Sequence, residues 1–272
     1  MMDMRTIDPE AIATKDLHQF IVGAVAPRPI AFASTMDEHG VANIAPYSFF
    51  NAFSSNPPIL VFSSNRRVAD SGTKDTLHNV EKNKEVVINV VNYSMVRQMA
   101  LASISYPSEV SEFDKSGLTK LASETVAPFR IQESPVHFEC RVQEIITLGD
   151  HGGAGHLIIC KVLRLHIDQS VLNGERIDPQ KLDLVGRLGR AHYVRASGDA
   201  IFDVYQSPLK LALGFDRLPA HLRESKVLTG NELAQLAGLY ELPSEAVITQ
   251  LLSEEVVPKA LISVEQPDDS LL

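Results

Sequence analysis

Apolar residues in the first 170 positions of the chain fall into short runs separated by turn residues. Residues 30–35 and 41–45 form two such runs, and the Asp37-Glu38-His39-Gly40 cluster between them predicts a hairpin. Further runs that are too short or too rich in β-branched residues for helices cover residues 59–62, 86–91, 136–146 and 156–167. The pattern therefore predicts a mainly β fold.

Two segments interrupt the strands with helical spacing. One covers residues 74–83 and the other covers residues 94–103. Many short strands with few helices favour a closed or nearly closed β-barrel over a parallel sheet. No strand is followed by a Gly-x-Gly-x-x-Gly turn and a helix, which argues against a doubly wound dinucleotide-binding domain.

The last quarter of the chain has a different pattern. Thr229 and Glu232 have the spacing of a capping box, and an apolar helical stripe follows them. A second helix is predicted over residues 245–252. We therefore divide the chain into a barrel domain, residues 1–197, and a helical C-terminal extension, residues 198–272, whose stripe we expect to pack on the barrel or on a partner subunit.

Composition narrows the possible functions. With 44% hydrophobic and 22% charged residues among 272, the chain has the composition of a globular protein. Its net charge of −9 argues against nucleic acid or an anionic membrane as a partner. Cys140 and Cys160 lie in strand-like runs and are interpreted as buried reduced thiols. Because no apolar stretch approaches the ~20 residues that span a bilayer, we expect a soluble cytoplasmic protein.

An acidic protein that binds a phosphate must gather its cations in one place. Arg28, Arg66, Arg67 and Lys74 are a large share of the cations in the first third of the chain, and hydroxyl residues lie beside them. Residues 73–76 also open a predicted helix, whose first N–H groups can face an anion. From the residues alone, two interpretations stay open: an anion site, or solvated loop cations beside a helix cap.

Several blocks of the sequence, in order along the chain, resemble the flavin reductase-like family of FMN-binding split barrels. They are residues 23–56, which include Pro-Arg-Pro-Ile-Ala-Phe-Ala-Ser-Thr and Asn-Ile-Ala-Pro-Tyr-Ser-Phe-Phe-Asn, then residues 63–67, 74–79, 156–167 and 186–193. The resemblance covers about residues 15–197. It implies an FMN-binding split barrel, a Greek-key six-stranded barrel with peripheral helices, and a homodimer with flavin near the subunit interface.

The resemblance also implies roles for individual residues. The segment along the flavin ring corresponds to Ser48, Phe49, Phe50 and Asn51. The strand end beside the flavin side chain corresponds to Arg28, Ser34 and Thr35. The phosphate side corresponds to Ser64, Asn65, Arg66, Lys74 and Thr76. Positions near the exposed ring face, where a second substrate would bind, correspond to His192 and Tyr193.

The resulting hypothesis is an FMN-dependent oxidoreductase, an NAD(P)H:flavin reductase that passes hydride from nicotinamide to flavin. No residue is assigned as a catalytic acid, base or nucleophile, because the two cofactors carry the chemistry. One alternative is an FMN-binding electron-transfer protein that does not use NAD(P)H directly. Another is a barrel that has lost flavin and serves as an interaction protein. The His151, His156 and Cys160 region is interpreted as a hairpin, and no metal site is predicted.

Overall fold

The computed structural model describes residues 3–108, 110–204 and 211–253. The chain forms two compact units, Met1–Phe202 and Asp203–Leu272. In the described residues, every helix is too short or too polar to cross a bilayer.

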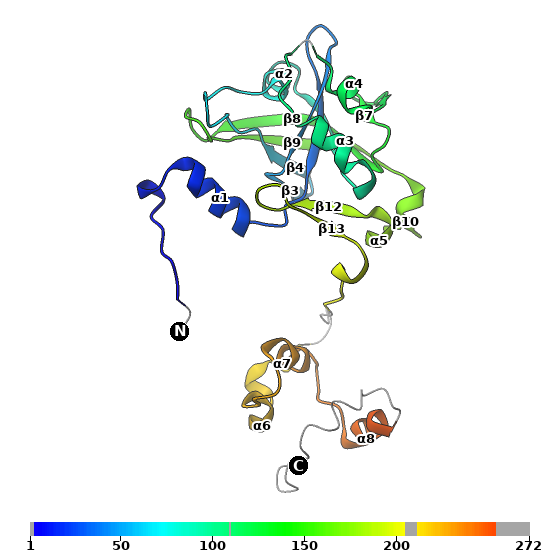
Figure 1. Ribbon diagram of the computed structural model, residues 1–272. Helices are drawn as coiled ribbons and strands as arrows, with labels where there is room; N and C mark the ends of the chain where they lie inside the picture. Colours follow the sequence, from blue (N-terminus) through cyan, green and yellow to red (C-terminus); the bar gives the residue numbers. More distant parts are fainter. Residues whose placement is uncertain (1–2, 109, 205–210, 254–272) are drawn as a thin grey trace. The chain divides into compact units, whose positions relative to one another are not determined.

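The first unit is built on one antiparallel sheet of seven strands in the order β2-β1-β5-β8-β9-β4-β3 (Figure 1). These strands are β1 (Ala31–Met36), β2 (Ala42–Tyr47), β3 (Phe50–Ser55), β4 (Pro58–Ser63), β5 (Glu85–Val90), β8 (Val136–Thr147) and β9 (His156–Ile167). The predicted β1–β2 and β8–β9 hairpins are both present. The sheet has seven strands where six were expected, because β3 pairs with β4 as an additional edge strand.

The strand order closes the sheet into a split barrel. β2 and β3 lie at opposite ends of the order, yet Ser48 and Phe49 alone separate them in the chain. Three residue steps span at most about 11 Å. The two edges of the sheet therefore lie close together, and the predicted split-barrel fold is confirmed.

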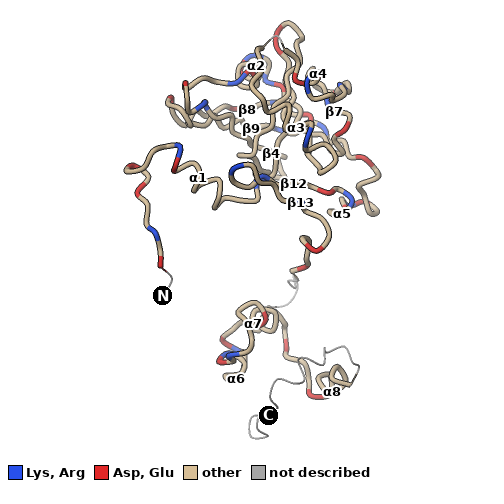
Figure 2. Tube along the Cα trace, viewed as in Figure 1, with Lys and Arg blue, Asp and Glu red and all other residues tan. Residues whose placement is uncertain are grey.

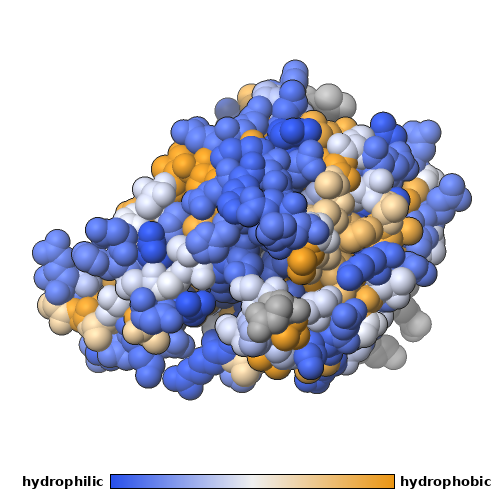
Figure 3. All heavy atoms as spheres, turned by 90° about the horizontal axis from the view of Figure 1, so that it is seen from above, coloured by the Kyte–Doolittle hydropathy of each residue, from blue (hydrophilic) through white to orange (hydrophobic). Residues whose placement is uncertain are grey.

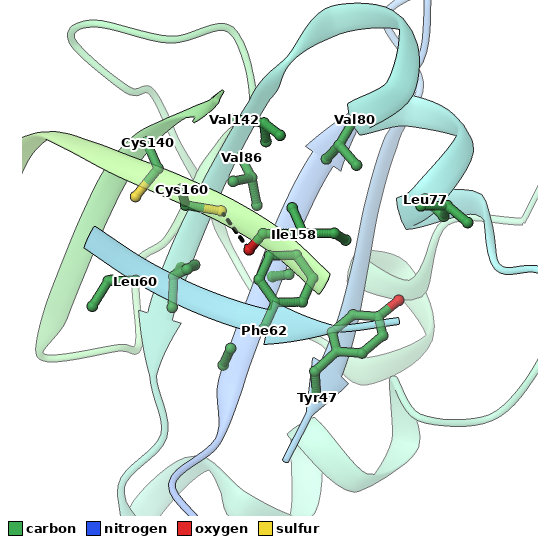
Figure 4. Packing of buried hydrophobic residues seen from close by; sticks show 13 residues of the cluster. Tyr47, Leu60, Phe62, Leu77, Val80, Val86, Cys140, Val142, Ile158 and Cys160 are labelled. Carbon is green, nitrogen blue, oxygen red and sulfur yellow. Dashed lines mark hydrogen bonds between the residues drawn. The ribbon is translucent and has the colours of Figure 1, made fainter. Parts of the chain in front are cut away.

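Apolar side chains fill the barrel and also cover part of its outside. Strand β1 is buried on both faces: Ala31 and Ala33 belong to the interior cluster, whereas Phe32 belongs to the outer one. Figure 4 shows the interior cluster, in which Phe62 and Ile158 are fully buried. This two-sided burial explains why the sequence of β1 is a continuous apolar run.

Short helices and ribbons surround the barrel. The helices of the first unit are α1 (Thr14–Ala24), α2 (Asp75–Asn83), α3 (Val96–Leu101), α4 (Glu112–Ser116) and α5 (Pro179–Leu182). Helix α2 adds Leu77 and Val80 to the interior cluster, and α3 and α4 add Met99 and Phe113 to the outer one. Paired short strands are β6 (Lys120–Leu121) with β7 (Arg130–Ile131), β10 (Leu172–Asn173) with β11 (Arg176–Ile177), and β12 (Leu184–Arg187) with β13 (Tyr193–Ala196).

The face seen in Figure 3 is viewed from above in the orientation of Figure 1, where α2 and the β1–β2 turn lie at the top. It is covered mainly by hydrophilic residues, with hydrophobic residues in smaller separate areas. This end of the first unit is therefore suited to contact with water.

The second unit contains α6 (Ala220–Arg223), α7 (Gly230–Ala237) and α8 (Glu245–Ser253). The capping box predicted at the start of α7 is present, since Thr229 Oγ1 accepts from Glu232 N and Glu232 returns a bond to Thr229 N. Leu218, Leu233 and Ala237 are the buried members of its small core.

Away from both ends of the barrel, β8 carries a fully buried carboxylate, Glu139. Its oxygens accept from the N–H groups of Glu124 (2.9 Å) and Thr125 (2.6 Å), and they lie 2.8 Å from His166 Nε2 and 3.8 Å from Arg130 Nε. Burial alone would raise the pKa of Glu139, but the hydrogen bonds from Thr125, Glu124 and His166 outweigh it and lower the pKa to about 2. The ionised carboxylate therefore holds the segment before β7 against the sheet.

We predict that Glu139→Ala lowers the free energy of unfolding by about 3 kcal/mol at pH 7, because it leaves several buried donors without an acceptor. The folded-state pKa lies below the ordinary value of 4.5, so the contribution of Glu139 is present above pH 4.5 and is lost as the pH falls towards 2. Denaturant unfolding at several pH values measures this. Glu144→Ala, an exposed glutamate of the same strand, is the control, and equal effects of the two substitutions would contradict the account.

Candidate functional site

Tyr47 lies where the apolar interior of the barrel meets a group of polar residues. Its ring packs against Phe62 with 5.1 Å between ring centroids, and Figure 4 shows its hydroxyl turned away from the cluster. On the outer side, Lys74 Nζ lies 4.9 Å from the centre of the Tyr47 ring. The Tyr47 ring therefore lies against the half-buried ammonium group of Lys74.

Three buried polar atoms, on Tyr47, on Ser64 beside it and on Arg66 two residues after Ser64, have no hydrogen-bond partner among the described residues. They are Tyr47 Oη, Ser64 Oγ and Arg66 Nε. Nearly all buried polar atoms in folded proteins are paired, so a group of unpaired atoms calls for an explanation. A ligand that accepts hydrogen bonds would satisfy all three, because hydroxyls and a guanidinium can each donate one.

The protonation states of Tyr47 and Lys74 favour the binding of an anion. Burial raises the pKa of Tyr47 to about 12, although the nearby Thr76 and Ser64 hydroxyls offset part of this rise without completing a hydrogen bond to it. Tyr47 is therefore a neutral donor at physiological pH. Burial, with the neighbouring Arg67, lowers the pKa of Lys74. A bound anion would counter both effects on Lys74.

Two asparagines near Tyr47 hold Thr35 and Thr76 in place through hydrogen bonds. Asn43 Nδ2 donates to Thr35 Oγ1 (3.1 Å) and to Thr76 Oγ1 (3.0 Å), and Asn79 Nδ2 also donates to Thr35 Oγ1 (3.1 Å). These bonds connect β1, β2 and the first turn of α2. Thr35 and Thr76 are consequently positioned on the side of the sheet that carries Tyr47.

Ser34 does not join this group. It precedes Thr35 in β1, so its side chain points to the opposite face of the sheet, where Ile44 is its partner in the register. Ser34 Oγ is fully buried and has no hydrogen-bond partner in the described part of the chain.

The segment after β4 is held in place by the turn before β9. Ser64 N donates to His156 O (3.1 Å) and Arg66 N donates to Ala154 O (2.8 Å), so the segment continues the strand pairing past the end of β4. Asn65 accepts from Ser63 Oγ and donates to Gly153 O, so its amide is used within the protein. This pairing fixes the positions of the Ser64 and Arg66 side chains.

The glycines of this turn allow the close approach. A Cβ on Gly155 would lie 2.6 Å from Ser63 Oγ, and one on Gly152 would lie 2.8 Å from the carbonyl oxygen of Val68. The first contact would force the Ser63 side chain to move, and the second would force the backbone at Val68 to move. The turn is thus a support for the Ser64–Arg66 segment, in agreement with its interpretation as a tight turn.

Arg28 belongs to a second group of residues, at the end of α1. Its guanidinium donates to Val22 O (2.6 Å), Val25 O and Leu188 O (3.1 Å), and Nε lies 3.4 Å from Ser48 Oγ. Burial, with the neighbouring Arg187, lowers the pKa of Arg28. Most of its donors are spent on backbone carbonyls, so Arg28 joins α1 to the barrel and to the turn after β12.

The polar residues near Tyr47 and the residues around Arg28 come together at the junction between β2 and β3. Phe49 O accepts a hydrogen bond from Ser63 N (2.8 Å), and the Phe49 ring lies between Arg28 (5.8 Å) and His18 (6.2 Å). Phe50 is half-buried against the interior cluster, whereas Asn51 is exposed. The Ser48–Asn51 backbone therefore begins beside Arg28 and passes the segment that contains Ser63 and Ser64.

His192 and Tyr193 lie on the β12–β13 ribbon. Both are exposed, and the Arg187 guanidinium covers the Tyr193 ring at 4.5 Å. The turn of this ribbon places Arg190 in the left-handed region, with φ of 53°, a conformation that favours glycine. A cavity of about 730 Å³ lies between this turn and α1. Its lining residues are Arg5, Ile12, Asp16, Gln19, Phe20, Gly23, Gly189, Arg190 and His192.

Of the residues expected from the sequence, one set gathers around Tyr47: Thr35, Ser64, Lys74 and Thr76. Arg66 lies two residues after Ser64 in the same segment. Ser48 and Phe49 adjoin this set through the chain and through Ser63, with Arg28 beside them. Tyr47 and Asn43 were not singled out from the sequence. Their alternation with Ala45 on one face of β2 is the signal that could have found them.

Comparison with known proteins places this arrangement in a class. Residues 23–180 match the model of the flavin reductase like domain. The chain belongs to this flavin reductase-like family of FMN-binding split barrels. Membership supports a flavin-related redox function.

Relatives span most of the first unit. An uncharacterized protein from Aquifex aeolicus is 36% identical over 184 residues, which are 67% of this chain and 91% of the relative. Among solved structures, nitrilotriacetate monooxygenase component B from Bacillus cereus is 29% identical, with a TM-score of 0.70 over 75% of this chain and 100% of that one. Flavoredoxin of Desulfovibrio vulgaris, at 20% identity, shares the fold, with a TM-score of 0.56 over 68% of this chain and 92% of that one.

We predict that Arg28→Ala releases α1 from the barrel, because the carbonyls of Val22 and Leu188 lose their buried donor. Hydrogen exchange of the α1 amides should accelerate, and the free energy of unfolding should fall by roughly 2 to 3 kcal/mol. Arg97→Ala is the control, since the Arg97 side chain is exposed. Unchanged exchange in α1 would show that Arg28 does not hold this helix.

Proposed function

We propose that the chain binds FMN, with the flavin phosphate among Ser64, Arg66, Lys74 and Tyr47. The observation that supports this most strongly is the set of unpaired buried atoms, Tyr47 Oη, Ser64 Oγ and Arg66 Nε, together with the Lys74 ammonium over the Tyr47 ring. A phosphate accepts several hydrogen bonds at once and carries a negative charge that would face the Lys74 ammonium. Thr76 at the start of α2 adds a hydroxyl and helix N–H groups on the same side.

The flavin ring is then directed along the Ser48–Asn51 segment, because that segment adjoins the phosphate group through the bond between Phe49 O and Ser63 N. Bound FMN would supply the redox chemistry as an acceptor of hydride. The chain orients the ring with backbone groups of Ser48–Asn51 and limits water beneath it with Phe50. Asn65, Thr35 and Arg28 act behind these groups as positioning residues.

We further propose that NAD(P)H is the hydride donor, which makes the protein an NAD(P)H:flavin reductase. Exposed His192 and Tyr193, predicted near the open face of the ring, would contact the nicotinamide cofactor. The match to the flavin reductase like domain supports reduction of flavin by this chain. Loss of flavin absorbance on addition of NADH or NADPH to the FMN-loaded protein tests this, and bleaching by dithionite alone would favour an electron carrier instead.

We predict that the double substitution Arg66→Ala/Lys74→Ala weakens FMN binding at least about 100-fold, because each charged contact with a phosphate contributes roughly 1.5 to 3 kcal/mol. Riboflavin lacks the phosphate, so its affinity should change little. Titration calorimetry with both ligands measures the difference. Lys82→Ala/Arg176→Ala removes the same charge from other surface positions and should leave FMN binding unchanged. Equal losses for FMN and riboflavin would mean that Arg66 and Lys74 serve folding.

The homodimer implied by the family resemblance has support in strand β3. This edge strand carries no charge, and Phe53 on it is 68% exposed. An uncharged exposed edge favours pairing with another chain. We propose that β3 faces a second copy of the protein, close to the Ser48–Asn51 segment.

We predict that sedimentation of the native chain gives the mass of two copies and that Phe53→Lys gives the mass of one. The added charge would have to be buried without a partner in the dimer. Lys placed at the exposed Leu148 is the control and should leave the dimer intact. A native chain that sediments as a monomer at micromolar concentration would contradict the proposed interface.

A further inference from the structure

A second cavity, of about 320 Å³, lies between α3 and the β12–β13 ribbon. Its lining residues are Tyr93, Val96, Arg97, Ala100, Val185, Ala191, His192, Tyr193, Val194 and Arg195. His192 also lines the cavity beside α1, so the two cavities adjoin across the turn of the ribbon. The wall combines apolar side chains from α3 and β12 with tyrosines and arginines.

The arginines of this cavity differ in how their charge is balanced. Arg195 forms two hydrogen bonds with Asp183 (2.7 and 2.8 Å), and its guanidinium lies 4.0 Å above the Tyr93 ring. Arg97 is exposed and makes no hydrogen bond, ion pair or ring contact with any residue of the described ranges. Arg97 is therefore an uncompensated cation in the same cavity as the Arg195 guanidinium that covers Tyr93.

The lining indicates the class of ligand. Guanidinium planes and tyrosine rings stack on aromatic bases, and a free guanidinium binds phosphate oxygens in pairs. No aspartate or glutamate is among the residues that line the cavity. Sites that select NAD place a carboxylate on the adenosine ribose, whereas an arginine there accommodates the 2′-phosphate of NADP. The cavity therefore has the features expected for a phosphorylated ribose.

Its size sets a further limit. Ligand pockets usually measure about 300 to 1,000 Å³, so 320 Å³ accommodates one ring system with its phosphate and not a whole dinucleotide. Because His192 lines both cavities, the rest of a dinucleotide could extend from this cavity into the one beside α1. Figure 2 shows basic residues beside β12, in a chain whose net charge of −9 would otherwise repel an anion.

We propose that this cavity binds the 2′-phosphoadenosine end of NADPH, with Arg97 on the phosphate and the adenine against the Arg195–Tyr93 stack. The inference rests on the proposed use of a nicotinamide cofactor and specifies it: the protein prefers NADPH to NADH through Arg97.

The test compares both nucleotides on the FMN-loaded protein and on its Arg97→Ala variant. The native protein should show the higher kcat/KM with NADPH. Arg97→Ala should raise the KM for NADPH about 10- to 100-fold and leave kcat and all NADH parameters unchanged. Arg97→Lys, which keeps the charge without the planar fork, should recover part of the preference. Arg176→Ala, which removes another exposed arginine, should have no effect.

Calorimetry with 2′,5′-ADP and 5′-AMP separates this inference from the proposed reductase activity. Tighter binding of 2′,5′-ADP that depends on Arg97 supports the cavity as the phosphate site, even if neither nicotinamide is oxidised and the reductase proposal fails. Equal binding of the two nucleotides to the native protein overturns the inference, even if both nicotinamides are oxidised. An equal loss of NADH and NADPH turnover in Arg97→Ala also overturns it.

Discussion

The contact between the Tyr47 ring and Phe62 sets the boundary between the barrel core and its polar end. Phe62 is fully buried and fills the interior, so the phenol above it is held with its hydroxyl facing outwards and Lys74 over its ring. Because β2 ends at Tyr47, the chain must leave the sheet at this point and cross to β3. The proposed phosphate site and ring segment both begin at this residue.

The cations around this boundary have different tasks, and their hydrogen bonds show which. Arg28 donates to backbone carbonyls and fixes α1, whereas Arg66 keeps one buried nitrogen unpaired and Lys74 has the Tyr47 ring as its neighbour. A cation whose donors are already used contributes position, and a cation with unused donors is available to a ligand. This distinction supports Arg66 and Lys74 as the phosphate contacts with Arg28 behind them.

Much of the barrel could be predicted because its strands are short apolar runs between turn residues, as in residues 30–35 and 59–62. Helix α1 was not predicted, although Leu17, Phe20, Ile21 and Ala24 have helical spacing; Val22 is its one buried residue. The family resemblance grouped Ser34 with Thr35, but strand alternation directs their side chains to opposite faces of the sheet. Tyr47 was missed because a tyrosine in an apolar strand gives no sign that its hydroxyl will be buried without a partner.

The position of the flavin phosphate tests the central claim most directly. A crystal structure of the FMN-loaded protein should place phosphate oxygens about 3 Å from Ser64 Oγ and Arg66 Nε, with Tyr47 Oη or Lys74 Nζ as a further donor. The unpaired atoms of the present structure would then all be satisfied. A phosphate bound elsewhere, for example in the cavity between α1 and the β12–β13 turn, with Tyr47 Oη, Ser64 Oγ and Arg66 Nε still unpaired, would contradict the account.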